Sequence, residues 1–411
     1  MTDFLYGDAI TARIDDLAHF TDGGRLTRLY LTPPHRQATE RVLAWMRDAG
    51  MVARIDATGS VVGRYEGFTP DAPALLLGSH IDTVRDAGRF DGNLGVLLAL
   101  ALVQRLHRAG RRLPFAVEIL AFGDEEGVRF ASTLGGSRAI AGRFDPAILD
   151  EKDAAGITRR RALEDFGCDP SHIAAEARRP DKVLGYVEAH IEQGPVLEAE
   201  NLPVALVTAI NGASRGTVSV TGEAGHAGTV PMGLRHDALA AAAEMIVAVE
   251  RRAQAEPDLV ATVGRLILQS PATNTIAGQA TFSIDLRAPS DDVRLAALAR
   301  IKADIGKIAE KRGVAAEATF NYDAPAARCD PALSDALAAA IARQGLGARR
   351  LPSGAGHDGM ALRGVFPIAM LFVRCKGGIS HNPAEYASPA DIDVAARVLI
   401  DFVDHFQPNQ S

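Results

Sequence analysis

The sequence has few cysteines, no long apolar run and no basic excess, and each absence excludes a class of protein. The cysteines are Cys168, Cys329 and Cys375, an odd and widely spaced set that argues against a disulfide framework and predicts a reducing compartment. No run of about 18 apolar residues exists, so we expect no membrane span. With a net charge of −7, the chain has no basic field for nucleic acid. The opening stretch MTDFLYGDAI carries acids where a signal peptide carries Lys or Arg, so we expect a cytoplasmic protein.

The longest apolar stretches predict a sheet whose central strands are buried on both faces. APALLLGS (72–79) and PFAVEILAF (114–122) read as such strands, and the stretch between them (91–110) reads as a helix. Strand–helix–strand order predicts an α/β sheet with helices on its faces. Residues 5–50 are predicted to be helical, and the basic cluster at 159–163 is predicted to be a solvated helix face.

The stretch 212–327 has a different pattern. Its periodicities give the order β-α-β-β-α-β, which is that of a ferredoxin-like layer. Strands and helices of the first kind resume after it. We therefore predict a larger α/β domain formed by residues 1–211 and 328–411, with a small α+β domain, residues 212–327, inserted into it.

Polar residues collect where the predicted strands of the larger domain end. In open α/β sheets, ligands bind at the carboxyl ends of the strands. The residues that follow strands there are His80, Asp82, Asp91, Asp124, Glu125, Glu126, His190, Glu192, Gln193 and His381. Taken singly, each histidine reads as a hydrogen-bonded loop residue and the three acids as a solvated turn. Because they recur at the same structural place, we expect them to form one site.

This mixture of imidazole and carboxylate suits a divalent ion such as Zn, Mn, Co or Fe. One ion needs three or four ligands, and at least five good candidates converge here. The excess predicts two ions that share a carboxylate, about 3.5–4 Å apart. Asp91 is the natural bridge because it directly precedes a helix start. Asp82 is predicted to accept the other N–H of His80 and so fix its tautomer, or else to cap the loop.

The motifs that hold these residues resemble one enzyme family. They are GSHIDTV, FDGNLGV, GDEEGVRF, EAHIEQGPVLE, GEAGHAGTVPMG and GISHNPAE, in this order between about residues 20 and 400. They resemble the hydantoinase/carbamoylase branch of the dimetal M20 peptidases, which includes N-carbamoyl-L-amino-acid hydrolases, β-ureidopropionases and allantoate amidohydrolases. The resemblance implies a dimetal aminopeptidase-like catalytic domain and an inserted lid and dimerisation domain, and hence a homodimer through residues 212–327.

The resemblance also implies a role for each metal ligand. His80, Asp91 and His190 would bind one ion, and Asp91, Glu126 and His381 the other. The ions would be Zn or Mn, with Co or Ni as substitutes in vitro. Glu125 matches the general base. A histidine at position 190 separates this branch from M20 enzymes that have a carboxylate there.

Other matches concern the substrate. His226 matches a histidine of the inserted domain that stabilises the oxyanion, often across a dimer interface, although Gly225 stands where relatives often have Asn. Asn274 and Arg287 match the pair that holds the substrate carboxylate. Arg suits that role because its planar fork can bind both oxygens. The remaining matches to substrate-contacting positions are Gln193, Gly356 and His357.

These matches predict hydrolysis of a linear ureido C–N bond in a small carboxylate, with release of ammonia. Allantoate is the first expected substrate, and an N-carbamoyl-L-amino acid or β-ureidopropionate is the alternative. An apolar pocket would favour carbamoyl derivatives of hydrophobic amino acids, whereas a second set of polar donors would favour allantoate. A dipeptidase or aminoacylase on the same scaffold is a more distant alternative. A non-catalytic binding module is disfavoured because every candidate ligand and the base are present.

Overall fold

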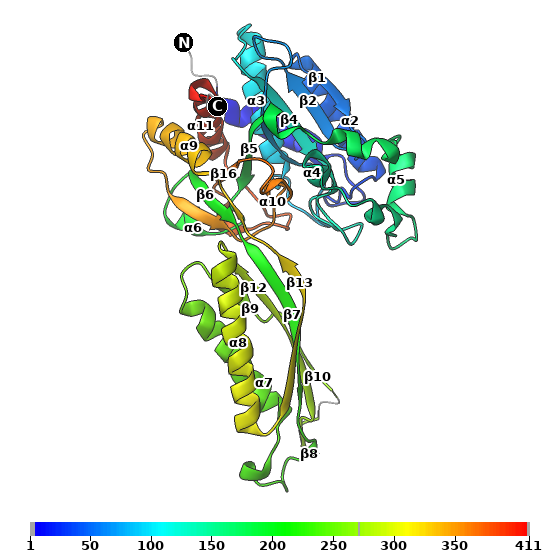
Figure 1. The fold of residues 1–411 in the computed structure, drawn as a ribbon, viewed down its shortest axis with the longest axis vertical. Coiled ribbons are helices and arrows are strands. Elements are labelled where there is room, and N and C mark those ends of the chain that lie inside the picture. The colour runs from blue at the N-terminus through cyan, green and yellow to red at the C-terminus, as the bar shows by residue number, and fades with distance from the viewer. Residues whose placement is uncertain (1–4, 270–271, 409–411) are drawn as a thin grey trace. The chain divides into compact units, whose positions relative to one another are not determined.

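The computed structural model describes residues 5–269 and 272–408, and the chain divides into two compact units (Figure 1). Unit 1 comprises the chain up to Thr208 together with Cys329–Leu351 and Ala355–Ser411. Unit 2 comprises Ala209–Arg328 and Pro352–Gly354. No helix in the described ranges is both long and apolar enough to cross a membrane.

A large mixed sheet organises unit 1. Across the sheet its strands are β1 (Val52–Ile55), β2 (Val61–Tyr65), β4 (Ala116–Phe122), β3 (Ala74–His80), β5 (Val183–Ile191), β16 (Ile368–Val373), β6 (Val204–Ile210) and β14 (Ala327–Arg328), with β15 (Arg350–Ser353) beside β6. Every residue of β3 and β4 is buried, as their continuous apolar sequences predict. Strands β4, β3, β5 and β16 run parallel to one another, so their carboxyl ends meet at one edge.

Helices cover this sheet. They are α1 (Tyr6–Ala18), α2 (Pro33–Asp48), α3 (Asn93–Arg108), α4 (Gly135–Ile140), α5 (Arg159–Asp165), α6 (Val196–Ala199), α9 (Pro331–Arg343), α10 (Gly359–Leu362) and α11 (Pro389–His405). Short 3₁₀ segments lie at Pro146–Asp150, Pro170–Glu176, Pro180–Lys182 and Lys376–Gly378. The predicted helical stretch 5–50 is two helices, because residues 19–32 form a loop between α1 and α2.

The main core of unit 1 forms where α3 packs on the sheet. Helix α3 is apolar nearly all round and contacts β3, β4 and β5 on one side and α1 and α11 on the other. It begins just after Asp91, so the packing of α3 against β3 and β5 fixes the place of that aspartate relative to the strand ends.

Unit 2 has an antiparallel sheet with helices on one face only. Its strands lie in the order β10 (Leu266–Leu268), β12 (Gln279–Ala288), β7 (Gly212–Thr221) and β13 (Ala315–Ala324), with β9 (Val260–Thr262) also beside β12. Helices α7 (Ala238–Gln254) and α8 (Asp291–Arg312) pack on the apolar face, and a short 3₁₀ segment lies at Met232–Leu234 (Figure 1). The alternation in β7 and β12 places serine, threonine and charged residues on the other face. A separate ladder pairs β8 (Gly225–His226) with β11 (Thr275–Ile276).

Candidate metal centre

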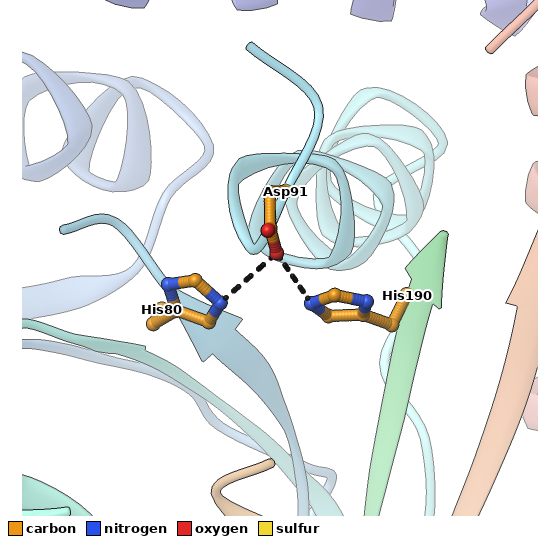
Figure 2. Close-up of side chains that lie close together, drawn as sticks. All are labelled: His80, Asp91 and His190. Carbon is orange, nitrogen blue, oxygen red and sulfur yellow. Dashed lines mark ion pairs between the residues drawn. The ribbon is translucent and has the colours of Figure 1, made fainter. Parts of the chain in front are cut away.

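In unit 1 the imidazole rings of His80 and His190 converge on one carboxylate oxygen of Asp91. His80 ends β3, His190 lies in β5, and Asp91 is separated from the first residue of α3 by Gly92. Nε2 of His190 lies 3.0 Å from Oδ1 of Asp91, and Nε2 of His80 lies 3.5 Å from the same atom. Figure 2 shows the two imidazole rings flanking Asp91 from the ends of their strands. All three residues are buried.

The other oxygen of Asp91 faces a second set. Nε2 of His381 lies 3.3 Å from Oδ2 of Asp91 and 3.6 Å from Oε2 of Glu126. In each set one ligand atom per residue lies within 4.8 Å of the others. Asp91 is therefore the one member that both sets contain, and it turns a different oxygen to each.

Both sets suit divalent ions. Nδ1 of His80 lies 3.1 Å from the carbonyl oxygen of Asp82, and Nδ1 of His190 lies 2.9 Å from that of Ile191. Each Nδ1 therefore carries the proton, which leaves the Nε2 lone pair directed at a carboxylate. Oε1 of Glu126 is buried without a hydrogen-bond partner. Lone pairs that face one another are stable when a cation lies between them, so the donor set fits two metal ions bridged by Asp91.

The charges of the acidic groups support this fit. Burial raises the pKa of Glu126 to about 7, with Asp91 adding to the effect. Burial also raises the pKa of Glu125 well above its ordinary value; His80 opposes this and Glu126 adds to it. Burial disfavours the charged form of Asp91 too, but the adjacent imidazoles of His190, His381 and His80 hold its pKa well below the ordinary value. Two dications would offset the mutual repulsion of these acids.

Asp82 holds the turn that carries the two glutamates. Its carboxylate oxygens accept hydrogen bonds from the backbone N–H groups of Glu125 (3.2 Å) and Glu126 (3.1 Å). Oδ1 lies 3.5 Å from Nδ1 of His80, farther than the Asp82 carbonyl that Nδ1 contacts. The main work of this carboxylate is thus to fix the backbone of the turn.

Gly92 makes room for the first set. Its φ is +64°, and a Cβ there would come within 2.5 Å of the His80 ring. Any other residue would meet both a strained backbone and a clash with a candidate ligand. Gly92 is also the N-cap residue of α3, which therefore begins without a side-chain cap.

The buried partner of Asp124 is Arg159. Arg159, at the start of α5, forms a buried ion pair with Asp124 and also donates to the carbonyl of Ser132 at 2.7 Å. Its guanidinium lies 4.6 Å from the ring centroid of Phe130. The prediction that 159–163 is a solvated face is therefore wrong for Arg159, although Arg161 is 65% exposed.

Residues other than the predicted metal ligands also orient Asp91. Nε2 of Gln193 donates to Oδ2 of Asp91 at 3.0 Å, and the hydroxyl of Ser380 donates to the same oxygen at 3.1 Å. Oε1 of Glu385 accepts from the backbone N–H groups of Phe90 and Asp91. Gln193, predicted to contact substrate, thus lies against the bridging carboxylate. The motif SHNPAE contained Ser380 and Glu385, but nothing in its spacing indicated this task.

A buried arginine links the two loops that carry the first set. Nε of Arg28 donates to the carbonyl of Ile81 at 2.7 Å, and Nη2 donates to the side chain of Asn93 at 2.7 Å. Burial lowers the pKa of Arg28 to about 10, with Asp82 opposing this. Arg28 therefore holds the end of β3 and the start of α3 together, a role that its place in the sequence does not reveal.

The predicted loop residues Gly356 and His357 lie beside the same centre. The ring of His357 is 4.4 Å from that of His190, edge to face, and His357 is buried. Burial, aided by His190, lowers the pKa of His357 well below its ordinary value. A Cβ on Gly356 would lie 3.7 Å from Oε1 of Glu125. The loop therefore packs against both a ligand and the predicted base.

In unit 2, Arg287 lies in a pocket on the helix-free face of the sheet. Its Nε and Nη2 donate to the two oxygens of Asp285 at 2.8 and 2.9 Å, and its Nη1 donates to the carbonyl of Gly354 at 2.7 Å. Nε of Arg215 donates to Oδ2 of the same Asp285 at 2.9 Å. The pocket has a volume of about 750 Å³.

His226 and Asn274 lie together elsewhere in unit 2. Both are exposed, and the N–H of Ala227 donates to the carbonyl of Asn274 at 2.9 Å. This ladder of β8 and β11 continues beyond the Gln279 end of β12, whereas Arg287 is near the opposite end (Figure 1). Eight residues of strand span on the order of 25 Å, so one copy of unit 2 does not bring Asn274 and Arg287 to one carboxylate.

The comparisons with known proteins all identify the same enzyme family. Residues 76–405 match the family model described as Peptidase family M20/M25/M40. The chain is 39% identical to an N-carbamoyl-L-amino acid amidohydrolase of Geobacillus stearothermophilus, over 96% of this chain and 97% of that one. It is 38% identical to allantoate deiminase 1 of Glycine max, over 97% and 89%. A hydantoinase/carbamoylase family amidase of Burkholderia multivorans has a similar structure, with a TM-score of 0.91, 32% identity and 97% of both chains covered.

Proposed function

The chain belongs to peptidase family M20/M25/M40, in its hydantoinase/carbamoylase branch of amidases, and from this premise we propose that it hydrolyses a linear ureido C–N bond and releases ammonia. It is a hydrolase that acts on non-peptide C–N bonds. The observation that carries the proposal is the sharing of Asp91 between two ligand sets, with Glu125 directly beside the ligand Glu126.

The chain supplies each part that such a reaction needs. Two divalent ions held by the two sets would polarise the ureido oxygen and make water more acidic. Glu125 would take the proton of the attacking water and pass it to the leaving nitrogen. Burial raises the pKa of Glu125 and His80 opposes this, so positive charge nearby favours the carboxylate form that a base needs. We assign the ions as Zn or Mn, because the donors are imidazole nitrogen and carboxylate oxygen.

The pocket around Arg287 supports allantoate as the first substrate. Arg287 would bind the carboxylate common to all the candidate substrates. The rest of the lining is rich in polar groups, which include Arg215, Thr217, Ser283 and Asn321. The second ureido arm of allantoate can pair with these groups, whereas a hydrophobic amino-acid side chain cannot. N-carbamoyl-L-amino acids remain the second candidate because a relative with that name matches nearly the whole chain.

The separation of Asn274 and Arg287 within unit 2 supports a homodimer. If both act on one substrate, His226 and Asn274 must come from a second copy of the chain. We therefore assign unit 2 as the dimerisation and lid domain, with a C2 arrangement in which each site uses both chains.

The cysteines Cys168, Cys329 and Cys375 are free thiols, which supports a reducing compartment such as the cytoplasm.

The experiment that tests the proposal is ammonia release from three substrates by protein loaded with Mn or Zn. Allantoate and N-carbamoyl-L-alanine should release ammonia, and N-acetyl-L-alanine should be deacylated far more slowly. The matched control is Glu125→Gln, which changes one atom of the predicted base. Faster turnover of the N-acetyl substrate would favour an aminoacylase, and no ammonia from either ureido compound would overturn the proposal.

A further inference from the structure

We propose that a groove between α1 and α3 of unit 1 binds a small carboxylate that has an apolar body. The groove has a volume of about 400 Å³, which lies within the range of ligand pockets. Its first residue on α3 is Ala101, ten residues past Asp91, which in a helix is about 15 Å. None of the candidate metal ligands or substrate residues lines it, so the inference does not depend on the proposed function.

The floor of the groove is apolar. Ile10 of α1 and Ala101 of α3 line it and are only 1% and 8% exposed. Both belong to the main core of unit 1, at the place where α1 packs on α3. The ring of Tyr6 adds an aromatic side chain to the lining. Because the floor offers no hydrogen bonds, it favours the part of a ligand that carries no polar atoms.

The rim of the groove is basic. Three arginines and no acidic residue belong to the lining: Arg13, Arg105 and Arg108. Arg105 forms an ion pair with Asp404 of α11 at 3.0 Å, and the same carboxylate pairs with Arg111 at 2.6 Å. Two guanidinium groups thus share one negative charge. The rim therefore keeps a positive charge that attracts an anion.

Two further acids act on this groove without neutralising it. Asp393 accepts a hydrogen bond from the backbone N–H of Tyr6 at 2.7 Å and forms its own ion pair with Arg397. Asp48 favours the charged form of Arg13 and so opposes the effect of burial on its pKa. Among the described residues, however, no carboxylate oxygen lies within 4.0 Å of the Arg13 nitrogens.

Arg13 is therefore a half-buried cation whose polar partner is neutral. Its Nη1 donates to Oε1 of Gln104 at 2.9 Å, and its guanidinium carbon lies 5.2 Å from the ring centroid of Trp45. Burial lowers the pKa of Arg13, and the charge of Arg108 lowers it further. An anion would stabilise this group, and the planar fork of a guanidinium matches the two oxygens of a carboxylate.

The floor and the rim together select the class of ligand. A neutral apolar molecule would cover the floor but leave Arg13 without a counter-ion. An inorganic anion would reach Arg13 but leave Ile10 and Ala101 in contact with water. A carboxylate with an aromatic or branched aliphatic body satisfies both, because its oxygens can pair with Arg13 while its body lies on the floor.

The fluorescence of Trp45, the only tryptophan in the chain, reports on Arg13 and so tests the proposal. Titration of the metal-loaded protein with 3-phenylpropanoate should give a saturable change, and calorimetry should give the same affinity. Arg13→Gln should weaken binding about 10- to 100-fold, the loss expected for charge-assisted hydrogen bonds, and Arg13→Lys should weaken it less. The neutral analogue 3-phenylpropan-1-ol and sulfate should each bind at least about tenfold more weakly than the carboxylate.

Two further variants show where the probe binds. Arg287→Gln removes the arginine proposed to bind the substrate carboxylate, and Arg300→Gln changes an exposed arginine of α8; both should keep the wild-type affinity. No saturable change up to about 10 mM probe would overturn the inference. Unchanged affinity in Arg13→Gln, or loss of the Trp45 response in Arg287→Gln, would also overturn it. Ureido hydrolysis is not measured, so the outcome is separate from that of the proposed function.

Discussion

Oδ1 of Asp91 lies 3.0 Å from Nε2 of His190, and this contact defines one half of a shared site. The other oxygen of the same carboxylate faces His381. A carboxylate that divides its oxygens between two sets of imidazole ligands fits a bridge between two ions.

Metal content should depend on which set a ligand belongs to. The wild type should bind two Mn ions per chain, His381→Ala about one, and Asp91→Ala fewer than His381→Ala because both sets lose a ligand. Mass spectrometry of the metal in dialysed protein measures this. His405→Ala, at the exposed end of α11, is the control and should retain both ions. Two ions retained in Asp91→Ala would contradict the shared bridge.

Adjacent glutamates should behave differently. Glu125→Gln should lower kcat by about 10²- to 10⁴-fold, the usual contribution of a general base, and leave the metal content unchanged. Glu126→Gln should also lower activity but should lose metal, because Glu126 belongs to the second set. Activity and metal content measured on the same samples separate the two roles. Loss of metal in Glu125→Gln would show that it is a ligand rather than the base.

Two inactive variants should complement one another if each site uses two chains. When Glu125→Gln and His226→Ala chains are mixed and exchanged at random, about a quarter of the sites should have both residues intact. Ammonia release should then rise well above that of either variant alone. A mixture of Glu125→Gln and Asp91→Ala should show no recovery, because both residues lie in unit 1 of the same site. No recovery in the first mixture would indicate that His226 does not act across a dimer.

The buried pair of Arg159 and Asp124 should matter for stability. Arg159→Met leaves the Asp124 carboxylate buried without its partner, which should cost about 3–5 kcal/mol of unfolding free energy. Replacing both residues, with Asp124→Leu as the second change, should recover part of this loss. Urea unfolding of metal-free protein, followed through Trp45 of α2, measures it. Arg161→Met on the same helix should change stability by less than about 0.5 kcal/mol.

Much of the metal centre could be predicted from the sequence, for a physical reason. His80 and His190 occupy the ends of long apolar strands, and parallel strands bring their ends to one edge, so sequence position alone implies proximity. Arg159 could not be predicted in this way. Its neighbours Arg160 and Arg161 make the segment read as a solvated face, and its partner Asp124 lies 35 residues away.

Asn274 and Arg287 are the reverse case, because they lie far apart in unit 2. They are close in sequence, and the resemblance assigns both to one substrate carboxylate. An extended strand separates residues much faster than a helix does, and β12 carries Arg287 far from the ladder that holds Asn274. The sequence already contained the strand pattern, but only the register of β7, β12 and β8 shows which end each residue occupies.

The central claim is that this chain uses a two-ion centre to hydrolyse a ureido bond. The most direct measurement is ammonia release from allantoate by protein stripped of metal with a chelator, before and after Mn is added back. We expect no ammonia from the stripped protein and restored release once about two ions per chain are bound. Equal release before and after would contradict the metal centre, and no release from the reloaded protein with allantoate or N-carbamoyl-L-alanine would contradict the reaction.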